Sequence, residues 1–225
     1  GYVLLGWFAE AVAMSIPDEI EGRWFVANVG SPESEHPRFS EAQALFAELQ
    51  QDQSLRDLPY RLFLIDTPEP NAFAVPGGGV GITVGLLDTV KTETGLAMVL
   101  AHELGHHSKR HVLRGLGRGI LQQSAIALVF GNTGGTDLLE VGALMASRRY
   151  SRKAEHEADE FGFRLLQGHF DSTEGATEFF QWACNEEQRE GDGGSWLSTH
   201  PMSRDRIERM RKLDGSLDGC DGGLD

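Results

Sequence analysis

The feature that most constrains the fold is a short apolar run that leads directly into a cluster of histidines. Residues 95–101 read Gly-Leu-Ala-Met-Val-Leu-Ala, so the helix that they predict is apolar on every face. A helix of this kind is buried on all sides, and the rest of the chain must cover it. The next residues, His102-Glu103-Leu104-Gly105-His106, place ionisable groups in the same buried helix, where each one needs a partner.

These five residues form an HExxH pattern, which on a helix is suited to binding a metal ion. At about 100° per residue, His102 and His106 lie about 40° apart and one turn along the axis, so both imidazoles can close on one cation. Glu103 lies beside them and could take a proton from water at the metal. The alternative is a pair of satisfied core histidines without a metal.

A catalytic zinc site has three protein ligands and an open position for water, so a further donor is expected elsewhere. The candidates are Glu155, His156 and Glu157, in a helix predicted over residues 151–167. Glu155 and Asp159 share the apolar face of this helix, whereas His156 and Glu157 fall on its polar side. We therefore expect Glu155 to be the third ligand and Asp159 to orient a ligating imidazole, with Glu157 on a solvated surface.

His107 and His111 are also four residues apart and form an alternative pair. No glutamate lies between them, and in a continuous helix over residues 94–114 His111 points about 180° away from His102. The two therefore do not share the first site, and hydrogen bonds to other elements are the favoured role for both.

The remaining pattern indicates an α+β fold that is mostly helical, with a small sheet. Strands are expected at residues 60–65, 71–75 and 80–84, the last two joined by a glycine turn. Helices are expected at residues 40–51, opened by a capping box of Ser40 and Gln43, and at 94–114, 117–130, 137–148, 151–167, 173–187 and 203–213.

Composition limits the partners more than the fold. The 225 residues carry a net charge of −14, which disfavours binding to nucleic acid or to an anionic membrane. The two cysteines, Cys184 and Cys220, form no CxxC pair and cannot build a thiolate zinc cluster. Residues 1–15 predict a membrane-proximal or an amphipathic segment, and residues 214–225 predict an acidic flexible tail.

With these residues in place, the chain resembles the M48 family of zinc metallopeptidases, the gluzincin group that includes Oma1-type proteins, HtpX and Ste24. The resemblance spans residues 16–213. It implies a zincin-like domain whose small sheet presents an edge strand to the active-site cleft, with one Zn²⁺ per chain bound by His102, His106 and Glu155. The motifs that carry it are HExxH at 102–106, SRxxExxAD at 151–159, NAFAxPGG at 71–78 and HPxxxxRI at 200–207.

The resemblance also implies the roles of the other site residues. Glu103 is expected to be the general base and acid. Asn71 and His200 are expected to flank the scissile bond, binding substrate backbone and the oxyanion, and Arg206 to brace the site. An extended substrate is expected to pair with the edge strand formed by Ala72, Phe73, Ala74 and Val75.

Together these expectations describe a zinc-dependent endopeptidase that cleaves unfolded or flexible polypeptides in protein quality control. The alternative is a catalytically silent zinc-binding chaperone or adaptor that holds polypeptide in the same groove. The segment between His106 and Glu155 is too short and polar for the spanning helices of HtpX and Ste24. The resemblance to Oma1-type bacterial members implies a domain in the periplasm of a bacterial cell envelope, and we expect it to be tethered by an anchor upstream of residue 1.

Overall fold

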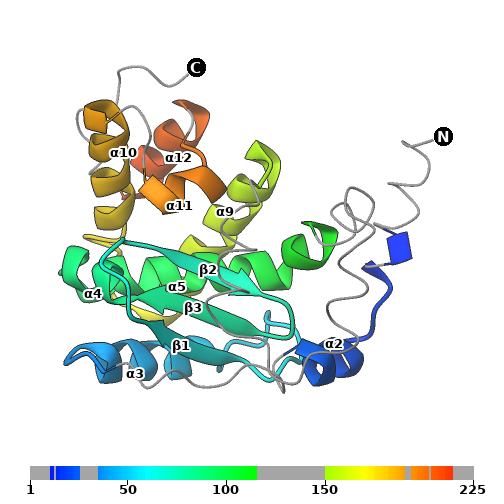
Figure 1. The fold of residues 1–225 in the computed structure, drawn as a ribbon. Helices are drawn as coiled ribbons and strands as arrows, with labels where there is room; N and C mark the ends of the chain where they lie inside the picture. The colour runs from blue at the N-terminus through cyan, green and yellow to red at the C-terminus, as the bar shows by residue number, and fades with distance from the viewer. Residues whose placement is uncertain are drawn as a thin grey trace.

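A buried helix, α5 (Glu93–Ser108), carries the fold, and the other elements are arranged around it (Figure 1). The computed structural model describes residues 11–12, 14–25, 35–115, 150–190, 194–202 and 204–214. The helix begins after Thr92, whose side-chain oxygen accepts a hydrogen bond from the amide of Gly95. Every residue from Gly95 to His107 is buried, so the apolar run is indeed the centre of the fold.

A three-stranded mixed sheet packs against α5. β1 (Arg61–Ile65) runs parallel to β3 (Gly79–Thr83), and β2 (Ala72–Val75) runs antiparallel to β3, in the order β1-β3-β2. β2 and β3 form the expected hairpin, and its turn holds Gly77 and Gly78 at positive φ angles of 87° and 91°, which glycine adopts without strain. Among the described strands β2 is therefore an edge strand, as the sequence predicts.

Helices cover the sheet and α5 from two sides. α3 packs on α5 and β1, whereas α9 crosses α5 on the side where α10, α11 and α12 gather (Figure 1). The prediction of a mostly helical α+β fold is confirmed. In chain order these helices are α2 (Asp18–Phe25), α3 (Phe39–Leu49), α4 (Val84–Thr89), α9 (Arg152–His169), α10 (Glu178–Glu190), α11 (Gly194–Thr199) and α12 (Arg204–Asp214).

The crossing of α9 over α5 is close because each helix presents a glycine to the other. A Cβ added at Gly105 of α5 would lie 2.9 Å from the carbonyl oxygen of Ala158 in α9. A Cβ added at Gly162 of α9 would lie 3.1 Å from the backbone nitrogen of His102. The two backbones therefore approach one another at distances that only glycine allows.

α2 is tied to the hairpin and to the end of α5 by buried charged groups. Glu21 is fully buried and accepts a hydrogen bond from the amide of Gly77, at 3.2 Å. It also pairs with Arg56, whose guanidinium donates to the backbone oxygen of His107 and to Asp18. A single network thus joins three elements that are distant in the sequence.

The helix predicted over residues 94–114 is wrong at its C-terminal end. α5 stops at Ser108, and Arg110 has a left-handed conformation with φ of 55°, which no other non-glycine residue shows in the part of the chain that the structure describes. Its guanidinium donates to the backbone oxygen of Ile16 and pairs with Asp18, so contacts with a distant segment hold the break in place. Residues 111–115 are helical again after this break.

Other elements differ from the prediction near their ends. The capping box of Ser40 and Gln43 does not form, because α3 begins at Phe39 and the imidazole of His36 accepts the hydrogen bond of the Arg38 amide. The helix predicted from residue 173 begins at Glu178, after Gly175 with φ of 84°. The short helices α2, α4 and α11 were not predicted. The helices predicted at 117–130 and 137–148 lie outside the described residues, as do most of segment 1–15 and of the tail.

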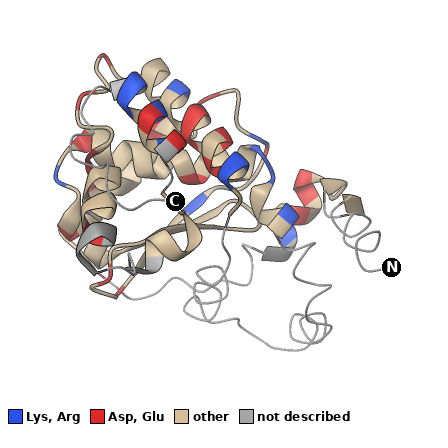
Figure 2. Cartoon of the chain, turned by 90° about the horizontal axis from the view of Figure 1, so that it is seen from above, with Lys and Arg blue, Asp and Glu red and all other residues tan. Residues whose placement is uncertain are grey.

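Charged residues are distributed over the helices that surround the buried α5. Lys and Arg are interspersed with Asp and Glu along them (Figure 2). No helix in the described ranges has the length and apolar character needed to cross a membrane.

Candidate metal centre

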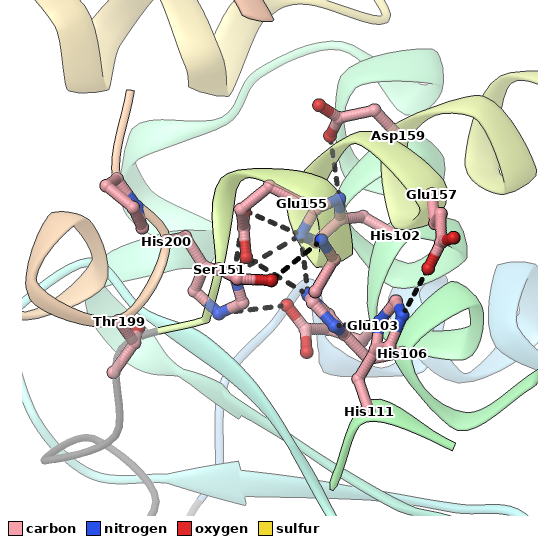
Figure 3. Close-up of polar contacts among 12 residues, drawn as sticks. His102, Glu103, His106, His111, Ser151, Glu155, Glu157, Asp159, Thr199 and His200 are labelled. Atoms are coloured by element: carbon pink, nitrogen blue, oxygen red, sulfur yellow. Dashed lines mark hydrogen bonds and ion pairs between the residues drawn. The ribbon is translucent and has the colours of Figure 1, made fainter. Parts of the chain in front are cut away.

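α5 carries the ionisable side chains of the HExxH pattern into the interior. His102, Glu103 and His106 are all fully buried. The Nε2 atoms of His102 and His106 lie 3.1 Å apart, and the rings meet edge to face with centroids 4.7 Å apart (Figure 3). The two imidazoles therefore point to one location, as their helical spacing predicts.

α9 brings a carboxylate to the same location. Glu155 lies in the first turn of α9, where Ser151 caps the helix by accepting a hydrogen bond from the amide of Ala154. Its Oε1 lies 3.5 Å from His106 Nε2, and its Oε2 lies 3.6 Å from His102 Nε2. The structure thus brings together the three residues that we expect to ligate a metal.

A fourth donor follows α11. His200 Nδ1 lies 3.2 Å from Glu155 Oε1 and 3.3 Å from His102 Nε2, and its Nε2 lies 3.6 Å from Glu103 Oε1. One ligand atom from each of His102, His106, Glu155 and His200 lies within 4.8 Å of the others, and all four residues are buried. The resemblance implies that His200 contacts substrate, and its position also allows it to serve as a metal donor.

Asp159 and Arg206 lie behind the donors and contact them directly. Asp159 Oδ1 is 2.9 Å from the Nδ1 atom of His102, on the side of the ring that faces away from the cluster. Arg206 donates to both oxygens of Asp159, at 2.8 and 2.9 Å, and its Nη1 lies 2.6 Å from Glu155 Oε2. Arg206 therefore connects one expected ligand, Glu155, with the carboxylate that orients another.

Burial and neighbouring charge separate the three carboxylates. Burial raises the pKa of Glu103 above its ordinary value. Burial acts in the same direction on Glu155 and Asp159, but the charge of Arg206 and the contacts with His102 and His200 together outweigh it. The pKa of Glu155 is therefore lowered, and that of Asp159 falls to about 2. Glu155 and Asp159 are therefore ionised at neutral pH, while Glu103 holds a proton more readily.

The imidazole of His106 is neutral in this environment. Burial lowers its pKa well below the ordinary value, and the charges of His102 and His200 act in the same direction. A neutral imidazole is the form that binds a metal ion.

The donor set fits a divalent metal ion. Imidazole nitrogens and a carboxylate oxygen are the donor types of catalytic zinc sites. Both carboxylate oxygens of Glu103 and the Nε2 atom of His200 are buried and have no hydrogen-bond partner among the described residues. Because buried polar atoms are costly without partners, the cluster is one that a hydrated cation would complete. His102, His106, Glu155 and His200 could hold such an ion.

Asn71 and β2 lie on the neighbouring sheet. The backbone of Asn71 bonds to Thr83 through its amide and its carbonyl, and its buried side-chain oxygen has no hydrogen-bond partner within the described ranges. The strand itself packs on α5, but each of its residues is at most 5% exposed. The expected substrate strand is thus in place and is covered in this structure. Its residues are Ala72, Phe73, Ala74 and Val75.

Two aromatic residues of the site were not predicted. The ring of Tyr150 stacks on that of His106, with centroids 3.8 Å apart and 18° between the planes. Trp196 stacks on His200, with centroids 4.9 Å apart. The signal for Trp196 was its position one helical turn before His200, and Tyr150 directly precedes Ser151, the cap of α9.

Two further polar residues lie closer to the metal donors than their helical phase predicts. His111 makes the expected hydrogen bond to another element, at Glu157 of α9, but it is not remote from the site, because α5 ends before it and its Nδ1 lies 3.0 Å from His106 Nδ1. Glu157 lies on the polar side of α9 as expected, with its side chain 32% exposed, but its Oε2 also lies 3.0 Å from His111 Nε2. His107 has the expected structural role, because its Nε2 donates to the backbone oxygen of Gly79 at 2.9 Å.

Comparisons with known proteins give relatives whose names describe proteases. The mitochondrial metalloendopeptidase OMA1 of Schizosaccharomyces pombe is 35% identical over 167 residues, which is 70% of this chain and 48% of that protein. OMA1 of Saccharomyces cerevisiae is 31% identical over 179 residues, covering 76% of this chain and 52% of its own length. Metalloprotease LoiP of Escherichia coli is 29% identical over 160 residues, covering 68% of this chain and 61% of its own length.

The chain spans about half the length of the two OMA1 proteins that it matches (48% and 52%). The sequence model of peptidase family M48 matches residues 37–214, a range that contains all four donors of the cluster. The chain therefore belongs to peptidase family M48.

Proposed function

We propose that this chain is the catalytic domain of a zinc-dependent metalloendopeptidase that cleaves unfolded or flexible polypeptides. The observation that carries the proposal is the buried convergence of His102, His106 and Glu155, with Glu103 beside them. Relatives named metalloendopeptidase and metalloprotease support a peptide bond as the target.

One zinc ion held by His102, His106 and Glu155 would supply Lewis-acid chemistry, activating water and polarising a substrate carbonyl. Glu103 takes the proton of the attacking water and passes it to the leaving amine. Two features suit it to this role: burial raises its pKa, and its side chain is fully buried beside His102 and His106. His200, whose Nε2 lies 3.6 Å from Glu103 Oε1, would stabilise the oxyanion that forms on the attacked carbonyl.

The substrate is proposed to bind as an extended strand along β2. Pairing of this kind uses backbone hydrogen bonds and reads side chains weakly, which favours unfolded segments of varied sequence, as protein quality control requires. Asn71, at the start of β2, would bind the substrate backbone through its unpartnered side-chain oxygen. Because the residues of β2 are buried, substrate binding requires that the strand first be uncovered.

The test is a substitution of the proposed base. Glu103→Gln keeps the shape of the side chain, so we expect it to retain zinc and to lose at least about a hundredfold in the rate of casein cleavage. Glu160→Gln on the exposed face of α9 is the matched control and should cleave at the rate of the parent protein. Retained zinc with an unchanged rate in Glu103→Gln would refute the assignment of the base.

The alternative is a silent zinc-binding chaperone or adaptor that holds polypeptide without cleaving it. The observation in its favour is that the donors and β2 are all buried in this structure. Incubation of the protein with casein, with and without a chelator, separates the two functions. Chelator-sensitive fragments support the peptidase, whereas bound but intact casein supports the alternative.

We also propose that the domain works beside a membrane, in the periplasm of a bacterial envelope. The support is the apolar run at residues 2–8, which resembles the end of a membrane anchor. Protease treatment of spheroplasts tests this location, since a periplasmic domain is digested without lysis of the inner membrane.

A further inference from the structure

We propose that Glu157 and His111 form, together with His106, a hydrogen-bonded chain that fixes the orientation and tautomer of the second histidine of the HExxH pattern. His111 and Glu157 are then positioning residues for metal binding. The inference rests on the proposed metal site and concerns how tightly that site binds its ion.

The chain consists of two short contacts. His106 Nδ1 lies 3.0 Å from His111 Nδ1, and His111 Nε2 lies 3.0 Å from Glu157 Oε2 (Figure 3). The side chain of His111 is only 1% exposed, so water does not compete freely for either contact. Glu157 closes the chain at the protein surface, where Lys153 Nζ lies 3.7 Å from its other oxygen.

The protons in this chain have one consistent arrangement. For His106 to bind a metal through Nε2, its proton must be on Nδ1. That N–H donates to His111 Nδ1, which must then be a bare nitrogen. A neutral His111 carries its proton on Nε2 and donates it to the carboxylate of Glu157. Each member of the chain thus sets the tautomer of the next, beginning from an ionised glutamate.

The backbone break at Arg110 is what makes the chain possible. In a continuous helix, His111 would lie about 140° around the axis from His106, on another face. The left-handed Arg110 turns the backbone so that the two rings meet. This conformation is unfavourable for arginine, and the contacts of its guanidinium with Ile16 and Asp18 maintain it.

The two histidines of the pattern are therefore supported in different ways. His102 has a carboxylate directly at its Nδ1, that of Asp159 at 2.9 Å. His106 reaches a carboxylate only through the imidazole of His111, and Tyr150 stacks on its ring face. Partners of this kind typically change metal affinity by about 10–100-fold when they are removed.

Three variants and two controls test the inference by metal affinity, measured in competition with a chromophoric chelator. His111→Leu removes the acceptor, and we expect its Zn²⁺ affinity to fall by about 10–100-fold. His111→Asn places an amide oxygen where Nδ1 was, and should bind within about threefold of the parent protein. Glu157→Leu should weaken binding by about 3–10-fold, because His111 loses its acceptor.

The controls are matched by burial and by position. His107→Leu removes another buried histidine of α5 that bonds to Gly79, and Glu160→Leu changes an exposed residue of α9; both should bind Zn²⁺ as the parent does. The absorption spectrum of bound Co²⁺ gives a second readout. We expect it to change in His111→Leu and to remain that of the parent protein in His107→Leu.

The outcomes separate this inference from the proposed activity. Unchanged affinity and an unchanged Co²⁺ spectrum in His111→Leu would overturn the inference, as would a loss in His111→Asn equal to that in His111→Leu. If His111→Leu does not fold by circular dichroism, equal affinities in Glu157→Leu and Glu160→Leu overturn it. A parent protein that binds no metal overturns both proposals, whereas one that binds metal without cleaving casein overturns the peptidase activity alone.

Discussion

Replacing Gly105 by alanine should weaken both the protein and its metal site, although alanine is the better helix former by about 1 kcal/mol. The added Cβ would lie 2.9 Å from the carbonyl oxygen of Ala158 and 3.0 Å from its Cα, inside the preferred carbon separation of about 3.5–4.0 Å. Because the obstructing atoms are backbone, α9 must move outward by roughly 0.5 Å. Overpacking costs up to about 3 kcal/mol, which leaves a net loss of about 2 kcal/mol.

The same movement reaches the metal donors. Glu155 lies three residues before Ala158 on α9, so its carboxylate should withdraw from His102 and His106 with the helix. A displacement of about 0.5 Å is near the limit for a precise site, and we expect metal affinity to fall by about tenfold or more.

Two measurements check this prediction. Urea unfolding of the metal-free protein, prepared with a chelator, gives the change in stability, and competition between the protein and a chelator for the metal gives the change in affinity. Gly168→Ala, also on α9, is the control, because the nearest atom to its added Cβ is 4.0 Å away. That change should stabilise the protein by about 0.5–1 kcal/mol. If Gly105→Ala is as stable as the parent and binds metal equally well, the close crossing does not set the position of Glu155.

Three further predictions concern the metal site, Arg206 and Glu178. Free zinc at about 100 times its dissociation constant should raise the free energy of unfolding by about 2.7 kcal/mol relative to the metal-free protein. Identical thermal unfolding with zinc and with a chelator would contradict a metal site. Arg206→Met leaves the buried carboxylates of Asp159 and Glu155 without their cation, so the chelated protein should lose about 3–5 kcal/mol in urea unfolding and recover part of it with zinc. Burial raises the pKa of Glu178, but hydrogen bonds from Thr92 and the Lys91 amide outweigh burial and lower this pKa below its ordinary value of 4.5. The ionised Glu178 therefore stabilises the fold above pH 4.5, and this stabilisation is lost as the pH falls through the pKa of the folded state. Glu178→Gln should therefore cost about 0.5–1 kcal/mol at pH 7 after solvent screening, and a cost that persists near pH 3 would refute the reasoning.

The central elements could be predicted because their signals are local. The apolar run from Gly95 to Ala101 and the HExxH pattern predict a buried helix with two convergent histidines, and the structure has that helix. On the next helix, the apolar phase separates Glu155 and Asp159 from their acidic neighbours, and both are buried. The glycines of the hairpin likewise indicate a turn between two adjacent strands.

What could not be predicted depends on contacts between distant segments. The end of α5 was missed because the unusual conformation of Arg110 is maintained by Ile16 and Asp18, far away in the sequence. The role of Glu157 was missed for the same reason, since its partner His111 comes near only after that break. The parallel pairing of β1 with β3 has no local signature either, because the intervening chain passes through β2.

The network around Glu21 gives α2 a mechanical connection to the proposed substrate strand. Glu21 bonds to Gly77 in the hairpin turn, and Asp18 at the start of the same helix pairs with Arg56 and Arg110. A force applied to α2 is thus transmitted through two contacts, that of Glu21 with Gly77 beside β2 and that of Asp18 with Arg110 beside the end of α5. The helix and the hairpin therefore move together unless the buried hydrogen bond between the Gly77 amide and Glu21 is broken.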